Sequence, residues 1–295
     1  MLPLLLILPL TAGADSPADT DPRALTIGAE AGDMGPGMME PLLAIDVNPG
    51  NSITPFAPHW MRGPEGRTLG FGFGVDKMLA SNFDIEIDGA WDSFSPHEGA
   101  SESGFGNVDV LSRLLFVNQP DMQAGVAPQV SLSVGSFEQS VGFSNAGFAL
   151  LGSARGGALP QDWNLGFLRA FELHADLGYS RILSNGSGDE IFFDPVLDYS
   201  LPYLQHLTKT ELPWPLRNLC FFAELNFDAV VSGSEQGPPT LYATPGISYM
   251  TDGYQVSAGV QLPLNHAGEH DQQIAVLAMI DISLDNLPVL GWMPF

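Results

Sequence analysis

The clearest pattern in the chain is a strict alternation of apolar and acidic positions between residues 82 and 92. The residues on the apolar face of an extended chain are Phe83, Ile85, Ile87, Gly89 and Trp91. The residues on the opposite face are Asp84, Glu86, Asp88 and Asp92, because side chains in a strand point alternately to its two sides. A soluble sandwich would expose the acidic face to bulk water, whereas an outer-membrane barrel would turn the apolar face to lipid and the acidic face to a wet lumen.

The same alternation recurs along most of the chain. The segments predicted as strands are 38–47, 67–76, 82–92, 107–116, 123–134, 141–153, 171–180, 193–201, 221–228, 241–249, 254–264 and 274–284. The first of them is the weakest, because Pro41 removes a hydrogen-bond donor from the ladder. Most have the roughly nine to eleven residues that a tilted membrane strand needs. The sequence therefore predicts an all-β fold, a transmembrane antiparallel up-and-down β-barrel of about 12 strands.

Composition supports this interpretation. The formal net charge is -24 while only 15% of the 295 residues are charged, and the mean hydropathy is nevertheless positive. A barrel separates apolar surface from carboxylates on every strand, which reconciles the two values. No apolar run of about 18 residues follows the N-terminus, so a helical membrane span is not expected. Ten Lys and Arg against 34 Asp and Glu argue against nucleic acid as a partner.

The expected division of the chain has four parts. Residues 1–14 resemble a secretory signal peptide that lacks a basic start, with Ala12-Gly13-Ala14 as the cleavage pattern. Residues 15–37 are expected to be a mobile periplasmic segment, 38–287 the outer-membrane barrel, and 288–295 a C-terminal tail. The short connectors at 80–81, 118–121 and 252–253 are expected at the periplasmic end, with 48–66, 93–103 and 232–238 outside.

One set of inward-facing residues stands out as a candidate functional site. The predicted lumen-lining residues are Asp84, Glu86, Asp88, Glu172, His174, Asp176, Asp194, Asp198, Glu224 and Asp228. As a pore wall they would concentrate cations and repel anions. Alternatively they are the solvated face of the strands and no more.

Catalytic and metal-binding patterns are weak. His174 lies between Glu172 and Asp176 on one strand face and could contribute to a metal site, but a histidine in a lumenal hydrogen-bond network explains it more simply. His266, Glu269 and His270 have the spacing His-x-x-Glu-His, which on a helix resembles a zinc-hydrolase motif; we expect a loop there. No nucleophile elbow or phosphate-binding loop is found. We therefore expect neither an enzyme nor a cofactor.

Three motifs carry a family resemblance. They are Gly-Phe-Gly-Asn-Val-Asp-Val at 104–110, Asp-Tyr-Ser-Leu-Pro-Tyr-Leu-Gln at 198–205 and Tyr-Ala-Thr-Pro-Gly-Ile-Ser-Tyr at 242–249. The chain from about residue 67 resembles the outer-membrane barrel family labelled for the meta-pathway of phenol degradation and the transporter-like proteins grouped with it. The resemblance implies about twelve strands and uptake of small organic molecules. The terminal Phe295 resembles the signal read by the outer-membrane assembly machinery, although Pro294 departs from that signal.

Two functions follow from these expectations. The first is a porin-like channel or transporter for small hydrophobic or cationic solutes, set in the outer membrane of a Gram-negative bacterium and surrounded by its lipid. The second is a closed or plugged barrel that serves as a structural or partner-binding part of the envelope. Inner-face glycines such as Gly72 and Gly74 leave room that an N-terminal segment or another protein could fill, and a protein partner or an oligomer is compatible with both.

Overall fold

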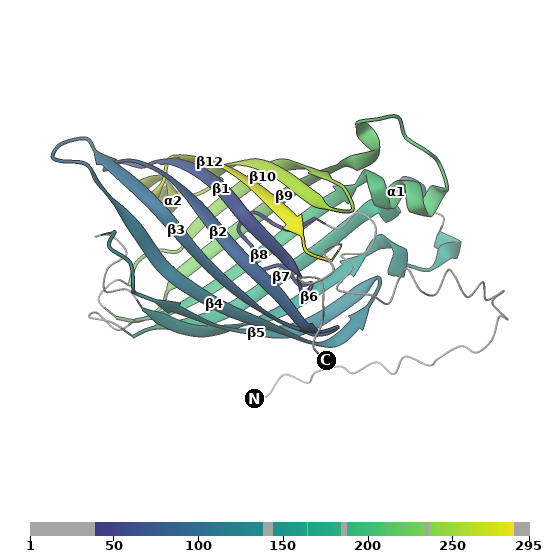
Figure 1. Ribbon diagram of the computed structural model, residues 1–295, viewed down its shortest axis with the longest axis horizontal. Coiled ribbons are helices and arrows are strands. Elements are labelled where there is room, and N and C mark those ends of the chain that lie inside the picture. The colour runs from purple at the N-terminus through teal and green to yellow at the C-terminus, as the bar shows by residue number, and fades with distance from the viewer. Residues whose placement is uncertain (1–38, 138–143, 164, 184–187, 234–235, 286–295) are drawn as a thin grey trace. The chain divides into compact units, whose positions relative to one another are not determined.

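The computed structural model describes residues 39–137, 144–163, 165–183, 188–233 and 236–285, and these residues form a closed antiparallel barrel (Figure 1). Each strand pairs with its neighbours in sequence, and β1 closes the barrel against β12. The strands of the described residues are β1 (Ser52–Arg62), β2 (Gly66–Ala80), β3 (Phe83–Pro96), β4 (Glu102–Gln119), β5 (Met122–Leu132), β6 (Asn145–Arg155), β7 (Phe171–Ile182), β8 (Asp189–Ser200), β9 (Leu219–Val230), β10 (Thr240–Met250), β11 (Tyr254–Pro263) and β12 (Ile274–Ser283). The predicted all-β barrel of about twelve strands is confirmed.

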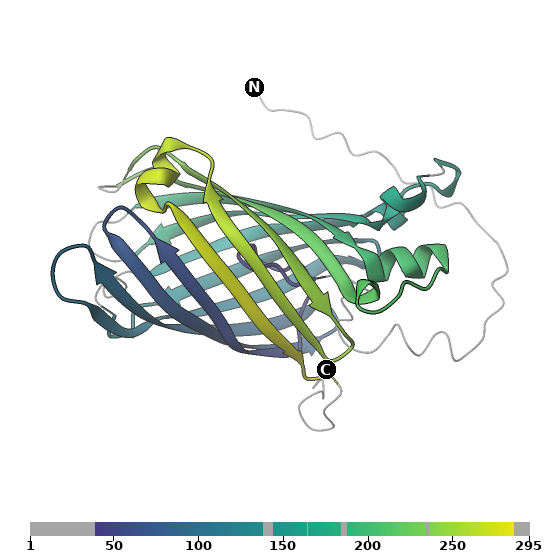
Figure 2. The same cartoon turned by 90° about the horizontal axis from the view of Figure 1, so that it is seen from above.

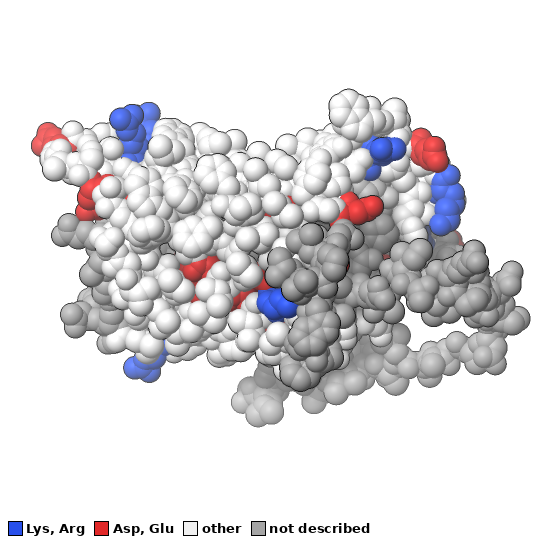
Figure 3. All heavy atoms as spheres, viewed as in Figure 1, with Lys and Arg blue, Asp and Glu red and all other residues white. Residues whose placement is uncertain are grey.

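The outer surface of the barrel is apolar. Large hydrophobic side chains that are more than a third exposed occur along the wall, for example Leu69, Ile87 and Phe116. In the view of Figure 3 the wall is mostly uncharged, and charged side chains gather mainly toward the two ends. A continuous apolar surface of this extent is unusual for a protein in water, whereas it matches the lipid-facing band of a membrane barrel.

The first strand begins later than predicted. Residues 39–51 form no strand before Ser52, so the predicted strand at 38–47 and the predicted loop at 48–66 are both wrong. The strand β1 was not predicted because it contains Pro55 and Pro58. Proline lacks an amide donor and is therefore rare within a sheet. The register of β1 against β12 shifts between Ile53 and Phe56, and its register against β2 shifts between Thr54 and Ala57. Pro55 therefore lies at a β-bulge, where a missing amide donor is tolerated.

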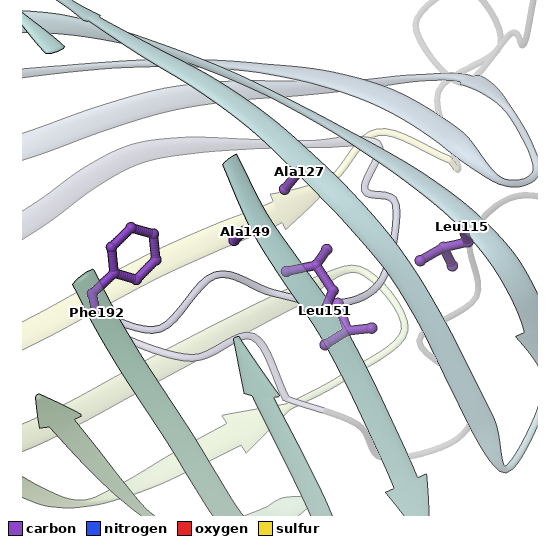
Figure 4. Close-up of a cluster of buried hydrophobic side chains, with 6 residues drawn as sticks. Leu115, Ala127, Ala149, Leu151 and Phe192 are labelled. Atoms are coloured by element: carbon purple, nitrogen blue, oxygen red, sulfur yellow. The ribbon is translucent and has the colours of Figure 1, made fainter. Parts of the chain in front are cut away.

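The stretch 39–51, which we call the lumen segment, runs inside the barrel and is seen as the dark purple coil in Figures 1 and 2. Its side chains supply the interior with apolar contacts. Val47 is fully buried in a cluster that lines one side of the lumen (Figure 4), whose other members are Leu115, Ala127, Ala149, Leu151 and Phe192. Met39 is buried in a second cluster with Cys220, Phe222 and Met250. The core of the molecule therefore lies between the lumen segment and the strands.

The two ends of the barrel carry different connections. The short turns near residues 81, 120 and 252 share one end, as predicted. The same end carries the connection with three short 3-10 helices, Gly156–Ala158, Gln161–Trp163 and Gly166–Ala170, and the connection with α1 (Leu201–Thr208) and a fourth, Leu216–Asn218. The opposite end carries α2 (His266–Asp271) (Figure 2). No helix within the described ranges is long and apolar enough to cross a membrane.

Several predictions lie outside the described residues. These are the signal peptide at 1–14, the segment at 15–37, the tail at 288–295 and the assembly signal at Phe295.

Candidate functional site in the barrel lumen

All ten predicted lumen-lining residues lie on four strands. Strand β3 carries Asp84, Glu86 and Asp88, β7 carries Glu172, His174 and Asp176, β8 carries Asp194 and Asp198, and β9 carries Glu224 and Asp228. Six of them are buried, namely Asp84, Glu172, His174, Asp176, Asp198 and Glu224. The alternation of each strand places them on the inner face. Their use as the wall of a conducting pore remains a prediction.

The lumen segment is bound mainly through its backbone by these carboxylates. The Glu224 carboxylate accepts hydrogen bonds from the amides of Leu42, Leu43 and Ala44 at 2.6, 3.0 and 3.4 Å. The amide of Ile45 donates to Asp176 Oδ2 at 2.8 Å. Backbone amides withdrawn from water need such partners, and hydrogen bonds to a charged acceptor are the stronger kind.

Two further contacts hold the ends of the lumen segment. Gln255 of β11 accepts from the Glu40 amide at 3.0 Å and donates to the Glu40 carbonyl at 2.8 Å. At the other end the Gly50 amide donates to Asp84 Oδ2 at 2.7 Å. A side chain at position 50 would collide with the Asp76 carboxylate, so glycine permits this close approach. The segment is thus fastened to β11, β9, β7 and β3 in turn.

A buried arginine organises the acidic side of the lumen. Arg113 on β4 lies 2.7 Å from Asp84 and 3.1 Å from Glu86, and it also pairs with Asp76. Its guanidinium donates to the carbonyl of Asp46 in the lumen segment at 3.5 Å. A planar guanidinium with several donors suits such a multiply paired position.

A second polar cluster lies nearer the α1 end. Arg155 is 3.4 Å from Glu172, and His174 Nε2 is 3.7 Å from Asp198. The Arg155 guanidinium also lies 5.2 Å from the centre of the Tyr203 ring. In the part of the chain that the structure describes, no group of three or more His, Cys, Asp or Glu residues is arranged to hold a metal ion. The described contacts of this cluster are thus two close pairs of oppositely charged or polar side chains and one guanidinium–ring contact.

Tyr203 ties α1 to the barrel at this end. Its hydroxyl donates to Asp121 at 2.7 Å, in the turn between β4 and β5. Burial and this hydrogen bond raise the pKa of Tyr203. Ser200 caps the helix by accepting from the Tyr203 amide, which is a common way to begin a helix. The connection between β8 and β9 thus begins with a helix docked on the wall.

A cavity of about 470 Å³ lies between the lumen segment and the strands. Its lining includes Ser131 near the end of β5 and Asn145 at the start of β6, so the cavity extends toward the α2 end. The carboxylate-bearing residues that line it are Glu40, Asp46, Glu86, Asp88, Asp109, Glu190 and Asp194, and Arg113 is the basic residue among its lining. A water-accessible space with this balance of charge has a negative potential that attracts cations.

Sequence reasoning missed the residues that fill or bridge the lumen. Residues 39–51 were expected as a strand and a loop, and Gln255 was not singled out. The pairing of Arg113 with Asp76 and Asp84 was not predicted. The motif His266-x-x-Glu269-His270 was expected in a loop; that expectation is wrong, because these residues form α2. Asn265 supplied a detectable signal, since Asn is a preferred residue before the first turn of a helix.

Comparisons with known proteins establish the fold. No family model matches the chain, and no curated protein matches its sequence. The chain is similar to the crystal structure of an outer membrane channel from Pseudomonas putida F1, with 8% identity and a TM-score of 0.53 over 83% of this chain and 99% of that chain. It is also similar to the NanC porin, with 7% identity and a TM-score of 0.51 over 79% and 98%.

The barrel fold, its apolar exterior and its polar interior together define a membrane-spanning β-barrel of the outer-membrane type. At identities of 7% and 8% the likeness to a channel and a porin concerns the fold. The resemblance to the family labelled for the meta-pathway of phenol degradation is supported only to this level, as a twelve-stranded outer-membrane barrel.

Proposed function

We propose that the protein is an outer-membrane channel for small cationic solutes, closed in the observed state by the lumen segment. The observation that carries this proposal is the cavity of about 470 Å³ lined by seven carboxylate residues and Arg113. A low-dielectric wall around such a cavity strengthens its field, which raises the local concentration of cations and excludes anions. The fold shared with a channel and a porin supports the same interpretation.

The substrate implied by the family resemblance is a small organic molecule. The acidic cavity narrows that class to organic molecules with a positive charge, such as amines, alongside inorganic cations. Apolar wall residues within the cavity, including Phe192 and Met279, would accept the uncharged part of such a solute. Ligand sites commonly combine an apolar lining with a few placed polar groups.

Closure follows from the hydrogen bonds of the lumen segment. Glu224 and Asp176 both serve as acceptors for the segment's amides and lie on the inner wall. Opening the lumen would release these amides and carboxylates to water, so the exchange costs little if water enters as the segment leaves. The same carboxylates would then face the passing solute. In this proposal the segment occupies positions that cations occupy in the open channel.

Reversal-potential measurements in planar lipid bilayers test cation selectivity. Under a KCl gradient the full chain should give a reversal potential on the cation-selective side. Asp109→Asn removes a carboxylate that lines the cavity and that, among the described residues, forms neither a hydrogen bond nor an ion pair with the lumen segment; it should reduce selectivity without changing the frequency of opening. Glu98→Gln, at the exposed tip between β3 and β4, serves as the matched control. Anion-selective current in the unaltered protein would contradict the proposal.

The second candidate function is a permanently plugged barrel that binds a protein partner. It is favoured by the anchoring of the lumen segment through two separate apolar clusters, around Val47 and around Met39. A partner that co-purifies with the barrel, together with an absence of current in both the full chain and variants with a loosened segment, would support this function over the channel.

A further inference from the structure

The helix α2 presents two histidines in a fixed arrangement outside the lumen. Asn265 accepts a hydrogen bond from the Gly268 amide at 2.9 Å and donates to the Pro239 carbonyl at 2.8 Å. Tyr242 of β10 donates to Asp271 at 2.6 Å. The helix is therefore anchored at its start and along one side. This anchoring leaves the other side, with its two imidazoles, facing solvent.

The two imidazoles converge on one point. His266 and His270 are separated by one helical turn, which places both side chains on the same helix face. Their Nε2 atoms lie 3.1 Å apart, and the ring centres lie 4.4 Å apart. Two nitrogen ligands that each lie ~2.0–2.1 Å from one metal ion are themselves roughly 3 Å apart. The observed separation is thus the one that a shared metal ion requires.

Glu269 provides the outer support that such a ligand pair usually has. Its Oε2 lies 3.3 Å from His266 Nδ1. A carboxylate at Nδ1 favours the tautomer that carries its proton there, which leaves the Nε2 lone pair free for a metal. The arrangement is exposed, with the His266 side chain 81% accessible and that of Glu269 64% accessible, so a dissolved ion can reach it without any movement of the barrel.

We propose that His266 and His270 form a two-histidine surface site for a late first-row divalent metal ion, with Cu²⁺ preferred to Zn²⁺. Neutral imidazoles suit these metals, whereas Ca²⁺ and Mg²⁺ require oxygen ligands. No third His, Cys, Asp or Glu within the described ranges joins the pair as a ligand. Water or an external ligand fills the remaining positions, so the bound ion stays exchangeable. The site is at the end of the barrel opposite α1 and does not depend on the channel proposal.

Calorimetric titration of the full, untagged protein in detergent tests this site, with Cu²⁺, Zn²⁺ and Ca²⁺ added separately. We expect one saturable Cu²⁺ site, a weaker Zn²⁺ site and no Ca²⁺ heat from this position. Electron paramagnetic resonance of the Cu²⁺ form should show splitting from two nitrogens. His266→Ala and His270→Ala should each abolish the saturable step, and Glu269→Gln should weaken it by about tenfold or more.

His97→Ala is the matched control, because His97 is also exposed and lies in another connection at the same end; its variant should bind Cu²⁺ as the unaltered protein does. Heat-modifiable migration on a gel confirms that each variant is a folded barrel. Undiminished Cu²⁺ binding in either helix variant, or a spectrum without two-nitrogen splitting, would show that the pair is only a histidine–histidine hydrogen bond and would overturn the proposal.

Discussion

Strand β3 and the lumen segment have similar compositions and opposite roles. β3 alternates Ile with Asp and Glu, and each class of side chain faces its own solvent. The lumen segment contains Leu42, Leu43, Ile45 and Val47 beside Glu40 and Asp46, but it has no alternation, because it is enclosed by the barrel on all sides. In β3 the apolar side chains face lipid and the acidic ones face the lumen. In the lumen segment, by contrast, backbone amides donate hydrogen bonds to the carboxylates of the wall. The alternation of apolar and polar residues therefore predicts the strands of the wall but not the segment that fills the lumen.

The largest effect on stability should come from replacing Arg113, whose guanidinium contacts both β3 and the lumen segment. Arg113→Met would leave Asp76, Asp84 and Glu86 without their buried partner. Breaking a buried ion pair on one side costs about 3–5 kcal/mol, so the free energy of unfolding in detergent should fall by that order. Arg181→Met, at an exposed position on β7, should change it by no more than about 0.5 kcal/mol. Equal stabilities of the two variants, measured by urea titration, would contradict the role given to Arg113.

The next effect tests the outer side of the wall alone. Ile87 is half exposed on the lipid-facing side of β3. Replacing it with Arg should cost about 2–4 kcal/mol if the position is near the middle of the bilayer, and less toward either surface. Its neighbour Asp88 faces the lumen, so Asp88→Asn should leave unfolding in liposomes almost unchanged. Two variants with the same stability would mean that the two faces of β3 are not in different solvents.

A smaller effect should loosen the lumen segment, at the loss of one wall hydrogen bond, from Gln255 to Ser257. Gln255→Leu removes both hydrogen bonds to the Glu40 backbone. Leaving buried backbone groups unpaired costs about 1–3 kcal/mol, which should appear as faster hydrogen exchange of amides in residues 40–45. Exchange in β3 and β4 should stay as slow as in the unaltered protein. Gln129→Leu, on β5 beside the cavity, is the control, and it should not accelerate exchange in the segment.

Much of the fold was accessible from the sequence because lipid and water impose opposite demands on successive residues. The alternation in β3, β7 and β9 predicted both the barrel and the inward direction of Asp84, Glu172 and Glu224. The strand β1 was not predicted because Pro55 and Pro58 interrupt its alternation, and residue types alone do not reveal its bulge. The lumen segment was missed because many of its hydrogen bonds to the wall are made by backbone amides, which leave no periodic pattern in the side chains. The pairing of Arg113 with Asp76 and Asp84 depends on strand register, which composition does not encode.

The most direct test of the central claim is single-channel recording of Glu224→Ala beside the unaltered protein. Glu224 accepts hydrogen bonds from three backbone amides of the lumen segment. Its loss should therefore free the segment while the hydrogen bonds between neighbouring strands keep the barrel closed. We expect the unaltered protein to be mostly shut and the variant to open often, with a current carried by cations. Asp228→Ala, on the same strand, should behave like the unaltered protein. Frequent opening of the unaltered protein that Glu224→Ala does not increase would contradict the account.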